Sequence, residues 1–316
     1  MASIQILRTE SADILQSIFS RYEDIVAEAG VYQSVILDMR GLLLLQAVRK
    51  AAAESSDAAA PARAAEAWLM SNVGSLDNGV RRAAIATLAL RLRPQSLGLP
   101  TDMLALYPQM HERLARALST LADYDPSFFP KDIALAAGTT MPAGGLSITI
   151  PLPGARGGFR SRLRQTAALF VRQWHQHGAD EALALLFETG VGRWMEFHVD
   201  ERNLRDFNPA GFRRMYHRLA ALMRARPELA GVYGASWLYD PAVSHVSPKL
   251  AFCFTVPLEA GGKSIRLRED PVQTAFAVAR SATRLKLWEA GTYRPVCYAM
   301  YWTRRDLLAW AEQDAG

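Results

Sequence analysis

The chain has 316 residues, of which 50% are hydrophobic, 21% charged and 9% aromatic, a composition that excludes a disordered, collagen-like or coiled-coil protein. Its two cysteines are too few for a disulfide framework or a cysteine-rich structural zinc site. The first residues include acids and lack an apolar run after a basic start, and no apolar stretch approaches the ~20 residues of a membrane span. We therefore expect a cytoplasmic protein without a membrane segment.

The formal net charge of +5 is unevenly distributed. Residues 1–140 contain 13 basic and 15 acidic residues, whereas residues 141–316 contain 23 and 16. This excess predicts that a small anionic partner meets the second half of the chain. Nucleic acid is not favoured as a partner, because the sequence contains no helix-turn-helix, zinc-finger or RNA-binding signature. A homo-oligomer is compatible with the sequence.

Residues 1–140 are expected to form a mainly helical domain. Apolar residues recur every three or four positions in 14–25 and 35–43, and 83–92 and 103–121 are further helical segments. An alanine-rich passage, 51–67, interrupts them at Pro61. Helices without an intervening strand predict an all-α region.

Residues 141–316 are expected to form an α/β or α+β domain with a mixed sheet and flanking helices. The strands expected from alternation or short apolar runs are 146–152, 193–200, 232–238, 250–256, 264–267 and 296–302. The expected helices are 160–187, 208–226, 271–289 and 303–312.

The segment 193–200 is the most informative for chemistry. As a strand it places Trp194, Glu196, His198 and Asp200 on one face and apolar residues on the other. A carboxylate beside an imidazole suits general acid–base catalysis, with Glu196 or His198 as the base and Trp194 lining the substrate site. The alternative is a strand whose polar side simply faces water.

His198 and Asp200 also match part of a two-histidine, one-carboxylate iron site. His245, in a turn after a strand, is the natural third ligand. This alternative predicts an Fe(II)-dependent oxygenase with open coordination positions for oxygen and substrate.

The end of the strand at 232–238 offers further polar groups. Tyr239 is a candidate proton donor, although half-buried tyrosines often have only a structural role. Ser236 and Lys249 are candidate substrate-binding residues near the same strand exit. Ser236 lacks the G-x-S-x-G context of a hydrolase nucleophile.

Arg160, Arg162 and Arg164 follow Gly157-Gly158 at the start of an expected helix. Backbone N–H groups at a helix start and nearby guanidinium groups favour binding of a phosphate or carboxylate. The alternative is a solvated basic helix. Neither a Walker sequence nor G-x-G-x-x-G occurs, so nucleotide-binding enzymes of those types are not supported.

Residues 282–301 resemble the late segment of the GCN5-related N-acetyltransferases. The positions that carry the resemblance are Leu287, Trp288, Glu289, Gly291, Tyr293 and Tyr298. The resemblance implies acyl transfer from acyl-coenzyme A. The arginine- and glycine-rich loop with which that family binds the coenzyme A pyrophosphate has no counterpart after 250–256, where Pro257–Lys263 stands instead.

Three functions follow from these patterns. The leading one is an enzyme acting on a small anionic or amine-bearing substrate, with acyl transfer of the N-acetyltransferase type. The second is the iron oxygenase. The third is a non-catalytic protein that binds an anion or takes part in an assembly.

Overall fold

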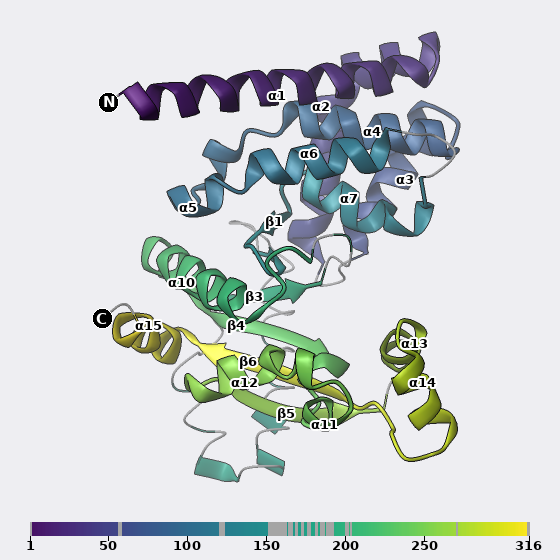
Figure 1. The fold of residues 1–316 in the computed structure, drawn as a ribbon. Helices are drawn as coiled ribbons and strands as arrows, with labels where there is room; N and C mark the ends of the chain where they lie inside the picture. The colour runs from purple at the N-terminus through teal and green to yellow at the C-terminus, as the bar shows by residue number, and fades with distance from the viewer. Residues whose placement is uncertain are drawn as a thin grey trace. The chain divides into compact units, whose positions relative to one another are not determined.

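The computed structural model describes residues 2–55, 59–119, 124–150, 193–199, 202, 204–269 and 271–314, with scattered positions from 163 to 187. The chain combines a helical N-terminal region with a mixed sheet and flanking helices, which confirms the predicted fold class (Figure 1). Its internal contacts define two compact units, one containing the described residues up to Pro142 and the other those from Ala143 onward. No described helix is long and apolar enough to cross a membrane.

The first unit is built from helices. In chain order they are α1 (Ala2–Glu28), α2 (Val31–Glu54), α3 (Ala60–Asn72), α4 (Asn78–Arg91), η1 (Pro94–Leu97), α5 (Thr101–Leu104), α6 (Tyr107–Leu118), η2 (Pro126–Phe128) and α7 (Phe129–Ala136). The strand β1 (Thr140–Pro142) follows them.

Helix α4 lies at the centre of this unit and packs against α1, α2, α6 and α7. Its alanines, including Ala83 and Ala86, are fully buried and let the neighbouring helices approach closely. Asp77 caps the helix by accepting a hydrogen bond from the Val80 amide at 2.8 Å. Buried Arg82 donates to the carbonyl of Leu118 at 2.6 Å. The unit therefore has its own core.

The second unit contains the remaining elements. They are β2 (Ser147–Thr149), β3 (Arg193–His198), α10 (Pro209–Ala225), β4 (Leu229–Ser236), η3 (Trp237–Tyr239), α11 (Val243–Val246), η4 (Pro248–Leu250), α12 (Phe252–Glu259), β5 (Lys263–Arg268), α13 (Pro271–Ala279), α14 (Ala282–Glu289), β6 (Cys297–Thr303) and α15 (Arg304–Gln313).

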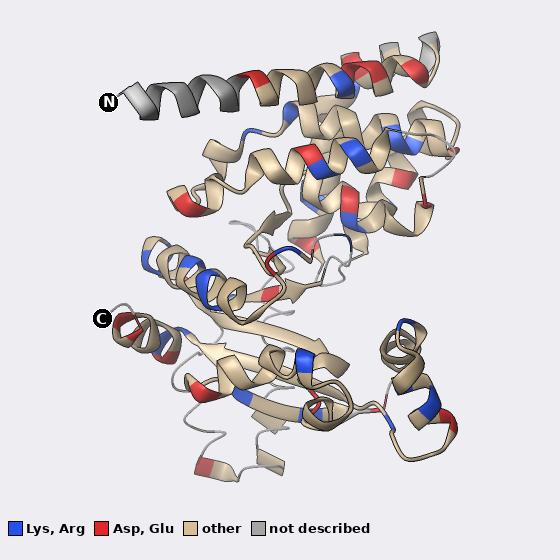
Figure 2. Cartoon of the chain, in the orientation of Figure 1, with Lys and Arg blue, Asp and Glu red and all other residues tan. Residues whose placement is uncertain are grey.

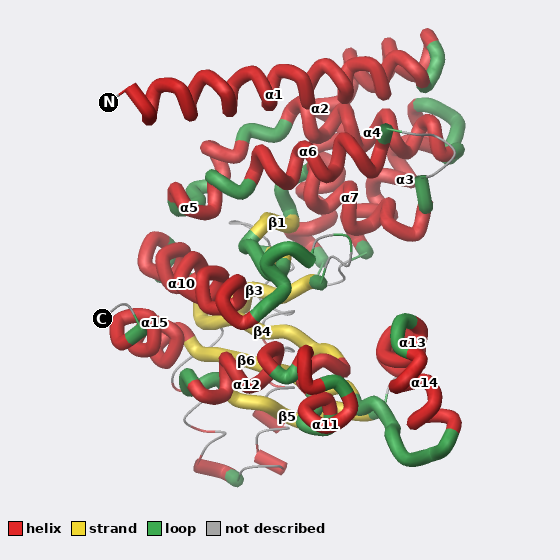
Figure 3. The backbone as a smooth tube through the Cα atoms, in the orientation of Figure 1, coloured by secondary structure: helices red, strands yellow, loops and turns green. Residues whose placement is uncertain are grey.

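Within the second unit the strand order is β2-β3-β4-β6-β5. Strands β3 and β4 are parallel, whereas β2–β3, β4–β6 and β6–β5 are antiparallel. Figure 3 shows β3, β4, β6 and β5 as neighbouring yellow strands. The single parallel pair therefore lies inside an otherwise antiparallel sheet.

One face of this sheet is covered by α10, α12 and α15, and we call it the helix-covered face. Phe197 of β3 contacts Tyr216 of α10 with ring centroids 6.1 Å apart. Trp302 of β6 contacts the same tyrosine at 4.8 Å and Trp310 of α15 at 5.3 Å. These edge-to-face and tilted aromatic contacts form the core of the unit.

Two sequence predictions need correction. The segment 250–256 is helical, forming the end of η4 and most of α12, and not a strand. Its continuous apolar run fits a buried helix as well as a buried strand. The expected single helix 271–289 is two helices, α13 and α14, with Ser281 capping the second through the Arg284 amide.

Candidate active site

The other face of the sheet carries a row of polar side chains at directly opposite positions. These residues, which we call the polar row, are in strand order Thr149, Glu196, Tyr233, Tyr301 and Lys263. Paired residues on neighbouring strands point to the same face, so the row runs across β2, β3, β4, β6 and β5. Figure 2 shows that β4 and β6 carry no charged residue, which leaves tyrosines between the acid and the lysine.

Glu196 is the acidic member of the row. Among the residues that the structure describes, its carboxyl group has no hydrogen-bond or ion-pair partner, and the side chain is half-buried. Burial raises the pKa of the Glu196 carboxyl above its ordinary value. Loss of hydration disfavours the charged form, so this carboxylate holds a proton more strongly than an exposed glutamate. Such a group is suited to accept a proton from a substrate.

His198 points to the same face two residues later, as alternation predicts. Its Nε2 lies 2.8 Å from Oγ1 of Thr149, and this hydrogen bond fixes the orientation of the ring. Thr149 is thus paired with Glu196 across β2 and β3, and it also forms the hydrogen bond with His198.

The carboxyl ends of the parallel strands β3 and β4 lie at the same edge of the sheet. His198 is the last residue of β3, and Ala235, which is exposed, comes one residue before the end of β4. In sheets with parallel strands, ligands bind outside such carboxyl ends. The polar face is therefore accessible near His198.

Tyr239 and Ser236 do not join this group. A Cβ atom added to Gly234 would lie 3.0 Å from the Tyr239 hydroxyl and 3.0 Å from the Phe197 ring, so Tyr239 is on the helix-covered face. Burial raises the pKa of Tyr239 above its usual range. Ser236 accepts a hydrogen bond from the Leu238 amide at 3.2 Å, which makes it the N-cap of η3. The sheet thus separates both residues from Glu196.

The other predicted residues lie in varied environments. Trp194 is 2% exposed and packs edge-on against Tyr301, so its role here is packing. His245 and Lys249 are exposed on α11 and η4. The remaining predicted residues, Arg160, Arg162, Arg164 and Asp200, lie outside the described residues.

No group of three or more His, Cys, Asp or Glu side chains suited to a metal ion occurs among the described residues. The predicted iron ligands His198 and His245 are not part of such a group, and Asp200 is not described. The iron oxygenase therefore receives no support from the described part of the chain. The two cysteines, Cys253 and Cys297, are both buried free thiols, and burial raises the pKa of Cys253.

Sequence reasoning missed Tyr233, Tyr301, Thr149 and Lys263. Each belongs to a segment in which a strand is predictable, but the register that aligns them with Glu196 depends on strand pairs far apart in the sequence. The only local signal is the recurrence of tyrosine at strand positions in 229–236 and 297–303.

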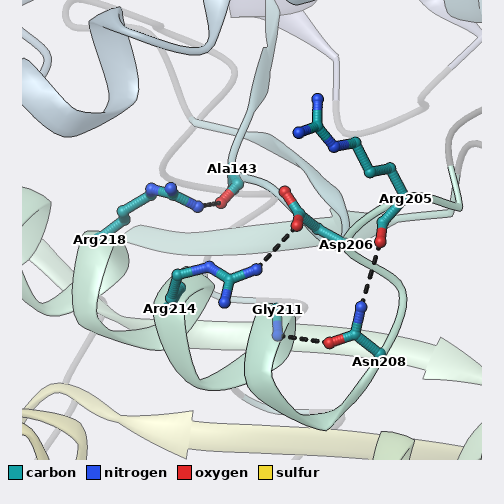
Figure 4. Close-up of polar contacts among 7 residues, drawn as sticks. All are labelled: Ala143, Arg205, Asp206, Asn208, Gly211, Arg214 and Arg218. Atoms are coloured by element: carbon teal, nitrogen blue, oxygen red, sulfur yellow. Dashed lines mark hydrogen bonds and ion pairs between the residues drawn. The ribbon is translucent and has the colours of Figure 1, made fainter.

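Side-chain hydrogen bonds and an ion pair hold residues 205–208 at the start of α10 (Figure 4). Asn208 caps α10 by accepting from the Gly211 amide at 2.9 Å and donates to the carbonyl of Arg205 at 3.1 Å. Arg214 pairs with Asp206 at 2.8 Å, and Arg218 donates to the carbonyl of Ala143 at 3.2 Å. These contacts fix residues 205–208 against the start of α10.

Replacing Gly211 with alanine is expected to destabilise the second unit by about 1–3 kcal/mol. An added Cβ atom would lie 2.0 Å from the carbonyl oxygen of Asp206, so the loop or the helix must move. Urea unfolding of Gly211→Ala and of Gly74→Ala, where nothing lies within 4 Å of the added atom, measures the difference. Gly74 has a positive φ and Gly211 does not, so Gly74→Ala measures backbone strain without crowding and Gly211→Ala measures crowding without such strain. Equal stability of Gly211→Ala and the native protein would show that the loop tolerates the methyl group.

Comparison with known proteins adds one structural likeness. No protein-family model matches the chain, and no curated protein matches it. A solved structure described as an acyltransferase in complex with decanoyl-CoA aligns with 93% of this chain and 87% of its own. The alignment has 13% sequence identity and a TM-score of 0.43.

Proposed function

We propose that this protein is an acyltransferase that moves an acyl group from an acyl thioester to an amine, with Glu196 as the general base. The observation that carries the proposal is the state of the Glu196 carboxyl group. It is half-buried, has no partner among the described residues and has a raised pKa. A buried carboxylate without a partner is unfavourable, and titratable groups with shifted pKa values are concentrated at functional sites.

The proposed reaction begins with an amine bound as ammonium beside Glu196. Glu196 accepts one proton, and the neutral nitrogen attacks the thioester carbonyl carbon. A C–N bond forms and the C–S bond breaks. The thiolate takes a proton from the Tyr233 hydroxyl, which is next to Glu196 in the polar row. The proton held by Glu196 then restores the tyrosine, and the second proton of the ammonium leaves to water.

Tyr233 takes the role for which the sequence favours Tyr239, because Tyr239 is on the opposite face of the sheet. His198 remains part of the proposed site as a hydrogen-bonding group at the accessible end of β3, oriented by Thr149. This assignment keeps proton transfer on one face of the sheet.

Acyl-coenzyme A is the proposed donor, in line with the resemblance of residues 282–301 to N-acetyltransferases. Its phosphates need cations and backbone N–H groups. Arg205 lies in the connection between β3 and α10 and has no ion-pair partner among the described residues (Figure 4). Arg205 would contact a phosphate group of the donor.

The proposal is tested with acetyl-, hexanoyl- and palmitoyl-coenzyme A as probes. Calorimetry measures their binding, and a thiol-reactive dye measures slow release of coenzyme A in the absence of an amine. We expect the acyl-coenzyme A of one chain length to bind at micromolar concentration. Release of coenzyme A from that donor should increase when an amine is added. If none of the three binds at 1 mM, the acyltransferase proposal is wrong.

A further inference from the structure

A second polar cluster lies around Arg284 near the start of α14. The side chain is 8% exposed, and its guanidinium carbon lies 4.7 Å from the centre of the Trp237 ring. Its Nε donates to the carbonyl of Ala277, and its Nη1 donates to Oγ of Ser247 at 2.8 Å. These contacts hold one planar cation between α13, η3 and the turn before η4.

The charge of Arg284 lacks a matching anion. Within the described part of the chain no carboxylate forms an ion pair with it, and no hydrogen bond is made by Nη2. Burial lowers the pKa of the Arg284 guanidinium from its ordinary value. A buried cation without an acidic partner is unfavourable, and its remaining N–H groups need acceptors. Nη2 is not among the fully buried atoms, so it is the edge of the guanidinium that is open to a further acceptor.

Tyr293 supplies a second unsatisfied donor beside Arg284. Its side chain is 3% exposed, and its buried hydroxyl has no hydrogen-bond partner among the described residues. Burial raises the pKa of Tyr293 to about 12, with a further contribution from Asp240, while nearby Arg284 lowers it. The Tyr293 amide donates to the carbonyl of Leu287 in α14 at 3.1 Å, which places the tyrosine beside the helix that carries Arg284, and each of the two side chains affects the pKa of the other.

Asp240 does not supply the missing anion. One carboxylate oxygen accepts from the Ala242 amide at 2.9 Å and the other from the Val296 amide at 3.2 Å. Both oxygens are engaged by the backbone, so the acid stabilises the turn after η3. The donors of Arg284 and Tyr293 remain without a shared acceptor.

The cluster lies at the end of β4. Trp237 follows the last residue of that strand, and its amide donates to the side-chain oxygen of Gln273 in α13 at 3.2 Å. The helices α13 and α14 lie side by side, apart from α10 and α15 (Figure 1). They thus bring Arg284 to the end of β4, beside η3.

We propose that Arg284 and Tyr293 form a binding site for an oxyanion, namely the carboxylate or phosphate group of a small molecule. The planar guanidinium donates from its free edge, and the tyrosine hydroxyl donates a further hydrogen bond. A bound oxyanion satisfies both donors and neutralises the buried cation. The site rests on the contacts of Arg284 and Tyr293 and does not depend on the proposed acyl transfer.

The test is an NMR titration of the full chain with inorganic phosphate and, separately, with sodium acetate, at constant ionic strength. The indole N–H signal of Trp237, assigned with Trp237→Phe, reports on the site because that ring stacks on Arg284. We expect a saturable shift with at least one ion, and the ion that binds more tightly distinguishes a phosphate from a carboxylate site.

Tyr293→Phe is the decisive variant, because its hydroxyl makes no hydrogen bond among the described residues and its removal should not reduce stability. We expect it to raise the dissociation constant about tenfold. Tyr107→Phe removes another buried hydroxyl without a partner, in the helical unit, and should leave the constant unchanged. Arg284→Lys keeps the charge but loses the planar fork, and should weaken binding at least as much as Tyr293→Phe.

The inference is overturned if neither ion shifts the Trp237 signal up to 50 mM, or if Tyr293→Phe binds as tightly as Tyr107→Phe. Because no acyl donor is used, such a result leaves the acyltransferase proposal unaffected. Conversely, failure of acyl-coenzyme A binding leaves the oxyanion site unaffected.

Discussion

Replacing Glu196 with glutamine is expected to lower kcat/KM for acyl transfer by about 10²- to 10⁴-fold, the usual contribution of a general base. Glutamine has nearly the same shape but cannot accept the proton of the ammonium substrate. Glu259→Gln changes an exposed glutamate of α12 and serves as the matched control. Retention of full activity by Glu196→Gln would exclude Glu196 as the base.

The raised pKa of Glu196 also fixes the direction of the pH dependence. The base acts in its ionised form, so kcat/KM should rise with pH through this raised pKa, at a higher pH than for an ordinary glutamate. The free energy of unfolding has the opposite dependence on pH. Because the folded state holds the proton more tightly than the unfolded state, stability is highest below the unfolded pKa and is lost as pH rises through the folded pKa.

Glu196→Gln should therefore melt at a higher temperature than the native protein at pH 8, and the difference should disappear near pH 4. Thermal unfolding at the two pH values measures this. A structural carboxylate would give the reverse, a variant less stable than the native protein at pH 8. The activity and stability measurements together distinguish a catalytic from a structural glutamate.

Replacing Trp302 with alanine is expected to destabilise the second unit by about 3–5 kcal/mol. Trp302 is 1% exposed and lies between Tyr216 of α10 and Trp310 of α15, so its loss leaves a large cavity under both helices. Its indole N–H has no hydrogen-bond partner among the described residues, so the loss is one of packing. Urea unfolding measures the change in free energy.

Trp288→Ala provides the comparison for Trp302→Ala. Trp288 is 36% exposed on α14, where Arg294 lies over its ring at 5.7 Å. We expect this change to cost less than Trp302→Ala, because the partly exposed Trp288 leaves no enclosed cavity when it is removed. Similar losses for the two variants would mean that Trp302 is not at the centre of the core.

The fold class and the boundaries of several elements are predictable from local signals. Asn208 and Pro209 mark the start of α10, and the residues between Arg193 and His198 alternate as β3 requires. The segment 250–256 is not predictable in this way, because a short apolar run suits a buried strand and a buried helix equally. Its helical form depends on packing against α10 and the sheet.

The candidate site is predictable only in part. Alternation places Glu196 and His198 on one face, but it cannot identify the residues that lie opposite them. The pairing of Glu196 with Tyr233 depends on the parallel register of β3 and β4, which is set by long-range contacts. Likewise, Tyr239 follows β4 closely in sequence but turns onto the helix-covered face through η3.

The pKa of the Glu196 carboxyl group tests the central claim most directly and requires no known substrate. It is measured by NMR on protein with ¹³C-labelled glutamate, with the Glu196 signal identified by its absence from Glu196→Gln. We predict a value above the ordinary 4.5 of a glutamate side chain, as burial without a partner requires. A value at or below 4.5 would mean that the carboxylate is solvated or paired, and would contradict its role as the base.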